Sequence, residues 1–382
     1  MIQTLSLQVP HLLFGPGSLS QLSNELKILG IHHPLIVTDK GVKQAGLLTK
    51  TIDACGNEAK TSIFDQVTEN PLFSDVEKGL HIYKESACDS VIALGGGSVI
   101  DTAKIIALLA KNKGEASNYL GVPNAIHGQS APLIVIPTTA GTGSEASHSA
   151  GLHPDAIKPS VGMSSRYLIP KLAILDPDLT KSLPKHLTAA TGIDALSHCI
   201  EGFFSKKEIP LGKNLALEGI RLATTHLKNA TNNQDDVNAR AQMMLSAFCG
   251  GISIGMGLGP AHAIAITCSD QGFHHGILSG IGLIETLQIT CAQIPDKAKE
   301  VAQAMGLKPD INLAQGLKEL MRELELPCNL FELGYKSKDL SNLAVLAHRS
   351  HFNIFAPYHP TISEYTEILK KSLNIDSSVD SI

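Results

Sequence analysis

Short apolar runs rich in valine and isoleucine recur through the first half of the chain. They occupy residues 34–39, 90–97, 132–139 and 171–177. Such runs are typical of strands that are buried on both faces, as in a parallel sheet covered by helices. Stretches with apolar residues at helical spacing, such as 101–111, separate them. The alternation predicts an α/β domain over residues 1–183.

The second half of the chain has a different pattern, in which apolar residues recur at helical spacing. It is clearest in residues 186–204, 214–228, 239–251 and 312–326. No internal repeat of 20 to 50 residues is visible, which argues against a solenoid. Residues 184–382 are therefore predicted to form an all-α domain.

Composition narrows the possible partners. The 382 residues are 43% hydrophobic and 18% charged, with a net charge of −5, which suits a packed globule and gives no basic surface for nucleic acid. No apolar run reaches the roughly 18 residues that span a bilayer, and the first residues lack a basic leader. Seven cysteines without a CxxC pattern predict reduced thiols. These features predict a cytoplasmic protein with no membrane or nucleic-acid partner.

A glycine-rich turn is the first feature with chemical meaning. Gly95, Gly96, Gly97 and Ser98 follow the strand predicted at 90–94 and lead directly into a helix. Glycines let the backbone approach a pyrophosphate closely, and the free N–H groups of the helix start stabilise its charge. The alternative is that the turn is only a tight connection between strand and helix.

A second glycine loop follows the apolar run at 132–137, where Gly141 to Ala146 match GxGxxA. In the usual dinucleotide fold the acid that binds ribose comes about 20 residues after the first glycine loop. Here the best acid, Asp39, ends the first predicted strand and precedes both loops. This order disfavours a standard Rossmann fold and suggests that the second loop folds over the same cofactor. A carboxylate at that position would accept from ribose hydroxyls and repel a 2′-phosphate, which favours NAD over NADP.

Histidine is unusually abundant, with 16 in the chain, and several histidines lie in apolar surroundings. Asp194 and His198 are four residues apart and would share one helix face, a spacing that fits metal chelation and also an ordinary helix-face pair. His262 and the pair His274 and His275 follow in a glycine-rich apolar stretch, where unpaired histidines are costly to bury. Together these positions could supply three imidazoles and one carboxylate to zinc or iron.

Five successive motifs resemble those of the iron-containing (group III) alcohol dehydrogenases. They are GGGSVIDTAK, PTTAGTGSEAS, LAILDPDLTKSLP, TAATGIDALSHCIEGF and GLGPAHAI followed by HHG, in order between Phe14 and Ile281. The resemblance implies an N-terminal α/β domain that binds NAD(P), a helical C-terminal domain and a metal in the cleft between them. This architecture is shared with dehydroquinate synthases.

The resemblance also implies roles for individual residues. The four metal ligands of the family match Asp194, His198, His262 and His275, with His274 an alternative for the fourth because the interval from His262 is one residue short. The positions that match dinucleotide contacts are Asp39, Asn70, Gly95, Gly96, Gly97, Ser98, Thr138, Thr139, Thr142 and Leu179. His148 lies where some relatives place a basic residue, which suggests an acidic substrate. Many relatives have a histidine for proton movement where this chain has Ile266, so His274 becomes the candidate for that role.

The function that follows is transfer of a hydride between NAD(H) and a primary alcohol or aldehyde held at a divalent metal. A hydroxyacid such as 4-hydroxybutyrate is one candidate substrate. Two alternatives stay open: a protein that binds cofactor and metal with little turnover, and a lyase resembling dehydroquinate synthase, for which no lysine- and arginine-rich phosphate pocket is visible. Relatives are dimers or larger, so we expect a homodimer, in which strand-like residues 2–9 could pair across a twofold axis.

Overall fold

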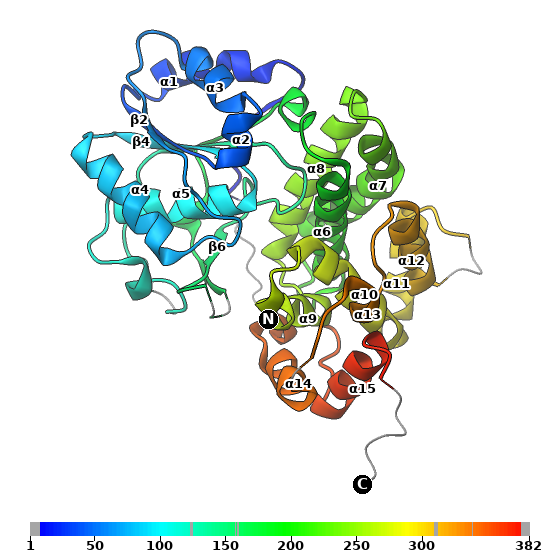
Figure 1. Ribbon diagram of the computed structural model, residues 1–382. Coiled ribbons are helices and arrows are strands. Elements are labelled where there is room, and N and C mark those ends of the chain that lie inside the picture. Colours follow the sequence, from blue (N-terminus) through cyan, green and yellow to red (C-terminus); the bar gives the residue numbers. More distant parts are fainter. Residues whose placement is uncertain are drawn as a thin grey trace. The chain divides into compact units, whose positions relative to one another are not determined.

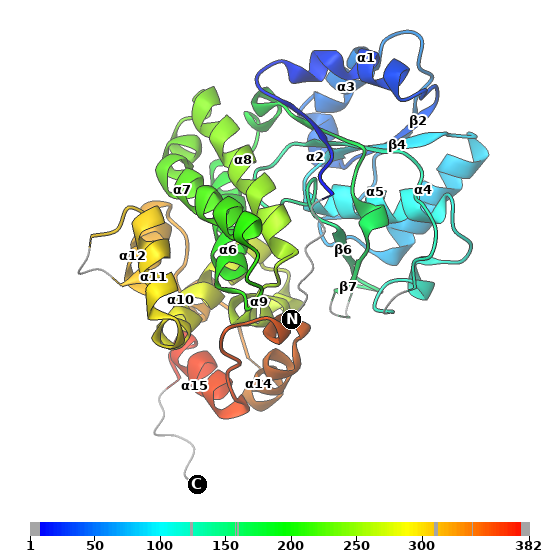
Figure 2. The same ribbon diagram turned by 180° about the vertical axis from the view of Figure 1, so that it is seen from behind.

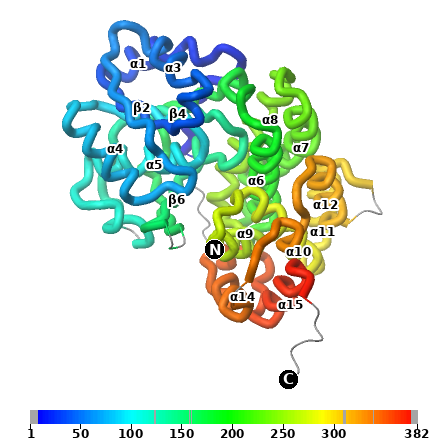
Figure 3. The backbone as a smooth tube through the Cα atoms, viewed as in Figure 1, coloured from blue at the N-terminus to red at the C-terminus, as the bar shows by residue number. Residues whose placement is uncertain are grey.

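The computed structural model describes residues 8–122, 125–156, 158, 160–308, 312–337 and 339–375. These residues divide into two compact units. The sheet unit comprises the described residues of Ser6–Leu183 together with Gln234–Met244, and the helical unit comprises those of Pro184–Asn233 and Leu245–Ile382. Figure 3 shows the chain path, blue to green through most of the sheet unit and green to red through the helical unit.

The sheet unit is built on a six-stranded parallel sheet. Its strands are β1 (His11–Phe14), β2 (Pro34–Val37), β3 (Ser62–Phe64), β4 (Ser90–Gly95), β5 (Leu133–Pro137) and β8 (Leu172–Leu175). Their order is β1-β8-β5-β4-β2-β3. A separate antiparallel hairpin consists of β6 (Ser149–Leu152) and β7 (Val161–Ser164). The four predicted apolar runs are confirmed as the central strands, whereas the edge strands β1 and β3 and the hairpin were not predicted.

The central strands are buried on both faces, and β2, β4 and β5 alternate their residues between two apolar cores. Leu35 and Val91 belong to the core that contains α5 (Gly97–Leu109) and α4 (Phe73–Glu85). Ile36 and Ile92 point the other way, into the core formed with α1 (Leu22–Ile28), α2 (Lys40–Gln44) and α3 (Leu47–Cys55). Figure 1 shows these two groups of helices on opposite sides of the sheet. Each such side chain contributes roughly 1.5–3 kcal/mol by its removal from water.

Three adjacent strands bring the predicted cofactor residues to one edge of the sheet. Val37 of β2 pairs with Ala93 of β4, and Gly95 of β4 pairs with Pro137 of β5. Because the strands are parallel, the segments that follow them emerge at the same edge. The strand order reverses between β2 and β4, and open α/β sheets bind ligands beyond the carboxyl ends of strands at such a reversal.

The helical unit contains only helices among its described elements, so the predicted all-α second half is confirmed. The helices are α6 (Lys185–Phe204), α7 (Pro210–Asn232), α8 (Val237–Ile254), α9 (Pro260–Thr267), α10 (His275–Gln293), α11 (Pro295–Ala304), α12 (Leu313–Glu323), α13 (Leu330–Leu333), α14 (Leu340–Arg349) and α15 (Ile362–Ser372). The first residues of α8 belong to the sheet unit, where Arg240 donates to the Thr180 carbonyl at 2.8 Å. Helix α6 packs against α7 and α10, as Figure 2 shows, and is buried from Thr188 to Phe204.

One glycine sets the close approach of α10 to α6. A Cβ atom at Gly276 would lie 2.1 Å from the carbonyl oxygen of Ala190, so only glycine fits there. This contact places His275, at the first turn of α10, beside the middle of α6.

The cysteines agree with the expected thiol chemistry. All seven cysteines are free, and burial raises the pKa of Cys55 to about 11, which keeps it a thiol. No helix in the described part of the chain is long and apolar enough to span a membrane. Residues 2–7 of the segment expected to pair across a twofold axis lie outside the described residues.

Candidate metal centre and cofactor loops

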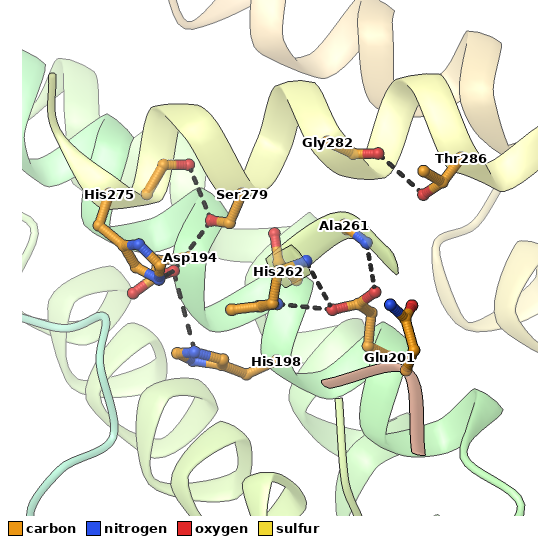
Figure 4. A network of polar contacts seen from close by, with 12 residues as sticks. Asp194, His198, Glu201, Ala261, His262, His275, Ser279, Gly282 and Thr286 are labelled. Carbon is orange, nitrogen blue, oxygen red and sulfur yellow. Dashed lines mark hydrogen bonds and ion pairs between the residues drawn. The ribbon is translucent and has the colours of Figure 1, made fainter. Parts of the chain in front are cut away.

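Three helices bring one carboxylate and three imidazoles together in the helical unit. Asp194 and His198 come from α6, His262 from α9 and His275 from α10, and one ligand atom of each lies within 4.8 Å of the others. Figure 4 shows the four side chains pointing toward one another. Oδ1 of Asp194 lies 3.9 Å from Nε2 of His198 and 3.8 Å from Nε2 of His275. All four residues offer lone pairs that a divalent cation accepts.

The carboxylate of Asp194 is held in its charged form although it is only 2% exposed. Burial alone would raise its pKa, but His198, His275 and His262 and a hydrogen bond from Ser279 together lower the pKa to about 2. The Ser279 hydroxyl donates to Oδ1 at 2.9 Å. Asp194 is therefore a buried negative charge that is ready to bind a cation.

His262 has one ring nitrogen engaged and the other available. Its Nδ1 lies 2.5 Å from Oε2 of Glu201, whereas its Nε2 is buried and has no hydrogen-bond partner among the described residues. Such an orphaned polar atom is costly unless a ligand satisfies it. The donor set therefore fits a divalent metal ion.

The two adjacent histidines have different positions. His275 joins the cluster, and its ring centroid lies 5.5 Å from that of His262. His274 is the N-cap of α10, where its Nδ1 accepts from the N–H of Gly276 at 3.1 Å. The neutral form of His274 therefore carries its proton on Nε2. Ile266, one turn after His262 on α9, is a half-buried apolar side chain.

The first glycine loop forms the start of α5 in the sheet unit. Gly96 is the N-cap, with no side-chain hydrogen bond, and Gly97 and Ser98 begin the helix. The first N–H groups of a helix lack intrahelical partners and bind anions well. The Ser98 hydroxyl donates to the Glu69 carbonyl at 2.5 Å, which places the segment of Asn70 beside this loop.

The second glycine loop packs directly against the first. The N–H of Thr138 donates to the Gly95 carbonyl at 3.0 Å. A Cβ on Gly97 would lie 2.4 Å from Cγ2 of Thr142, and one on Gly96 would lie 3.2 Å from Cγ2 of Thr139. The structure therefore brings Gly95–Ser98 and Thr138–Thr142 together at one edge of the sheet.

Two ionisable side chains of α5, the half-buried Asp101 and the buried Lys104, hold the second loop in place. Asp101 accepts from the Ser144 hydroxyl and from the Gly151 N–H, the latter at 2.8 Å. Lys104, which is fully buried, donates to the carbonyls of Ser147 and Ser149 at 2.9 and 2.6 Å. Burial lowers the pKa of Lys104 to about 8, a shift that Asp101 and Glu145 oppose.

The remaining predicted residues are spread over the sheet unit. Asp39 caps α2, where its Oδ1 accepts from the Val42 N–H at 2.9 Å. Leu179 lies in the short 3-10 helix Pro177–Thr180, with its side chain in the apolar core. His148 immediately precedes β6, and its carbonyl accepts from the Ser165 N–H at 2.8 Å. Among the described residues, the side chain of Asp39 forms no hydrogen bond with either glycine loop.

Known proteins match this chain over almost its whole length. The family model for iron-containing alcohol dehydrogenase matches residues 10–177, and the model for the C-terminal domain of the same family matches residues 188–373. A 4-hydroxybutyrate dehydrogenase of Cupriavidus necator is 34% identical over 377 residues, covering 95% of this chain and 98% of that protein.

The chain belongs to the iron-containing alcohol dehydrogenase family. Alcohol dehydrogenase 4 of Schizosaccharomyces pombe is 33% identical and covers 94% of this chain and 87% of that protein. A solved structure of sulfoacetaldehyde reductase from Bifidobacterium kashiwanohense in complex with NAD+ has a TM-score of 0.91 at 26% identity, covering 98% of this chain and all of that one. These matches confirm the predicted family, fold class and oxidoreductase activity of an alcohol dehydrogenase.

Sequence reasoning missed several residues that support the site of this alcohol dehydrogenase. Glu201 contacts His262, Ser279 contacts Asp194, and Asp101 and Lys104 anchor the second glycine loop. A signal for the last two was present, because both are charged residues inside an otherwise apolar helix. Glu201 follows Asp194 by seven residues and His198 by three, so it shares their helix face.

Proposed function

We propose that this iron-containing alcohol dehydrogenase holds one divalent cation, iron or zinc, with Asp194, His198, His262 and His275. The observation that carries the proposal is the convergence of these four side chains around the buried Nε2 of His262, which has no hydrogen-bond partner among the described residues. A divalent cation bound there would lower the pKa of an alcohol and polarise an aldehyde carbonyl. The four residues hold and orient it, and the reaction is hydride transfer between a primary alcohol or aldehyde and NAD(H).

The proposed NAD site consists of the two glycine loops, with Asn70 and the backbone at Leu179 as further contacts. Gly96, Gly97 and Ser98 would present N–H groups to the pyrophosphate, and Thr138, Thr139 and Thr142 would supply hydroxyls and backbone groups. The free helix start and the contact between the loops support this assignment. In this proposal residues 1–183 form the NAD-binding domain and residues 184–382 the metal-binding domain.

The proposed substrate is a short hydroxyacid such as 4-hydroxybutyrate. The relative named for this activity is 34% identical across nearly the full chain. The test is NADH formation by the purified, metal-loaded protein with 4-hydroxybutyrate and with butanol, together with metal analysis by emission spectroscopy. We expect bound metal and a higher kcat/KM for 4-hydroxybutyrate. Metal and NAD binding without turnover of any alcohol or aldehyde in a broad panel would instead support the cofactor-binding alternative.

His148 is proposed to favour the carboxylate of that substrate. It lies half-buried at the start of β6. A hydrogen bond to a charged group contributes about 1.5–3 kcal/mol, so His148→Ala should raise the KM for 4-hydroxybutyrate by about tenfold or more. The KM for butanol should stay unchanged and is the control. Equal KM changes for both substrates would remove the acidic-substrate role.

Asp39 is proposed to set the preference for NAD. Its carboxylate stands just beyond β2, beside the strand that leads into the first glycine loop. Repulsion between a carboxylate and the 2′-phosphate of NADP in close contact costs several kcal/mol of binding free energy, and the substitution removes it. Asp39→Ala should therefore raise the NADP-to-NAD ratio of kcat/KM by about 10- to 100-fold. An unchanged ratio would place the discriminating group elsewhere.

His274 is proposed to transfer the proton of the reaction, because Ile266 has no group that can carry one. Its hydrogen bond from Gly276 leaves Nε2 as the proton-bearing atom of the neutral ring. A positioned acid or base contributes about 10²- to 10⁴-fold to a rate. His274→Ala should thus lower kcat by about that factor, with partial recovery on addition of imidazole. A wild-type kcat in the variant would show that the proton leaves by another route.

The assembly and location of the enzyme are further parts of the proposal. Family resemblance supports a homodimer, which light scattering of the purified protein would detect as twice the monomer mass. Seven free thiols support a reducing compartment and hence a cytoplasmic location. Fluorescence microscopy of a tagged chain tests the location.

A further inference from the structure

Glu201 makes three contacts to the segment that carries His262, although Glu201 is not one of the four proposed metal ligands. The side chain is 4% exposed and comes from α6, the helix of Asp194 and His198. Its Oε1 accepts from the Ala261 N–H at 2.8 Å. Its Oε2 accepts from the His262 N–H at 3.3 Å and lies 2.5 Å from Nδ1 of the His262 ring. Figure 4 shows the carboxylate between these groups.

The two backbone contacts replace a missing helix cap. The N-cap of α9 is Gly259, which has no side chain to accept from the first free N–H groups of the helix. Glu201 supplies that acceptor from a different helix. A Cβ at Gly259 would lie 2.7 Å from Oε1 of Glu201, so glycine at the cap is what lets the carboxylate approach. The first turn of α9 is therefore fixed to α6.

The contact with the ring fixes the proton of His262. An ionised carboxylate only accepts hydrogen bonds, so Nδ1 must be the N–H that donates to Glu201. Nε2 then carries the lone pair, and this is the buried atom without a partner among the described residues. A carboxylate behind a histidine ligand also makes the imidazole more basic and so a stronger ligand.

We infer that Glu201 is a positioning residue of the metal centre, which holds the His262 ring in the Nδ1–H tautomer with Nε2 directed into the cluster. This rests on the proposed metal-binding function. Glu201 acts through His262 rather than by coordination. Outer residues of this kind typically change metal affinity by about 10- to 100-fold.

The variant that isolates this role is Glu201→Gln, which keeps the size of the side chain. Glutamine has one acceptor oxygen, so when that oxygen caps Ala261 the NH2 group faces Nδ1 of His262. Two donors cannot face each other, and the ring is then favoured with its proton on Nε2. The matched control is Glu285→Gln on α10, which removes another carboxylate of the helical unit. The Glu285 side chain is 7% exposed, its Oε2 lies 3.7 Å from Nζ of Lys371, and it is outside the metal site.

Two measurements test the inference on the full-length apo protein. Zn²⁺ affinity by chelator competition should weaken by about 10- to 100-fold in Glu201→Gln and stay unchanged in Glu285→Gln. Nitrogen NMR of histidine-labelled protein, with the His262 signal assigned by its loss in His262→Ala, should show the Nδ1–H tautomer in the wild type and the Nε2–H tautomer in Glu201→Gln.

The inference is overturned if Zn²⁺ affinity is unchanged in Glu201→Gln. It is equally overturned if affinity falls while the tautomer stays the same, because Glu201 would then act only as a cap of α9. Failure of the proposed function looks different: Zn²⁺ would bind equally to the wild type and to His198→Ala. The tautomer is measured without metal, so it reports on Glu201 in either case.

Discussion

Alanine at His198 or His262 is expected to leave the purified protein without bound metal. Each substitution removes one of four converging ligands and leaves Asp194 as a buried charge with fewer partners. A metal acting as a Lewis acid lowers the activation free energy by several kcal/mol, and each 1.36 kcal/mol changes the rate by a factor of ten. Turnover should therefore fall by at least about a thousandfold. Emission spectroscopy measures the metal, and NADH absorbance measures turnover.

The matched control for this prediction is His186→Ala. His186 is an exposed residue in the first turn of α6, the helix that also carries His198. It should keep full metal content and activity, and circular dichroism should show unchanged helix content in all three variants. Full metal occupancy in both His198→Ala and His262→Ala would contradict the assignment of the site.

The central strands could be predicted because burial on both faces leaves an uninterrupted apolar run in the sequence. β1 and β3 could not, since each lies at an edge of the sheet and is not buried along its whole length. The hairpin of β6 and β7 contains Gly151 and Gly162, residues with little preference for strands. Contacts from Asp101 and Lys104 hold the chain in this region, and such contacts do not show in local sequence.

The candidate site was predictable to a similar extent. Asp194 and His198 are one helical turn apart, so their shared face follows from spacing alone. His262 and His275 reach them only because α9 and α10 pack against α6. The close approach of Gly276 to Ala190 is a tertiary contact, which local sequence does not reveal. Glu201 shares the helix face of the ligands, yet an acid on a helix is usually solvated. Its partner lies 61 residues away and is visible only in three dimensions.

Alanine at Gly97 is expected to weaken NAD binding by about 10- to 100-fold. The new Cβ would lie 2.4 Å from Cγ2 of Thr142, so one of the two glycine loops must move. Overpacking of this kind costs about 1–3 kcal/mol, which corresponds to that loss of affinity if the displaced loop binds the cofactor. Gly97 is not among the glycines with positive φ, so the effect comes from the contact and not from backbone strain.

The second variant for this prediction is Thr142→Ser, which removes Cγ2, the nearest of three Thr142 atoms to the new Cβ. It keeps the hydroxyl, whose oxygen lies 2.9 Å from the new Cβ and can turn to another rotamer. In the Thr142→Ser background, Gly97→Ala should regain much of the lost affinity, while Thr142→Ser alone should bind NAD nearly as the wild type does. Titration of NADH fluorescence measures all four proteins and gives the coupling energy between the two positions. Losses that simply add, without recovery in the double variant, would show that the contact between the loops does not shape the NAD site. We expect this recovery because the shortest of the three contacts is removed and the remaining hydroxyl can rotate, so that both loops can return to their places at the edge of the sheet.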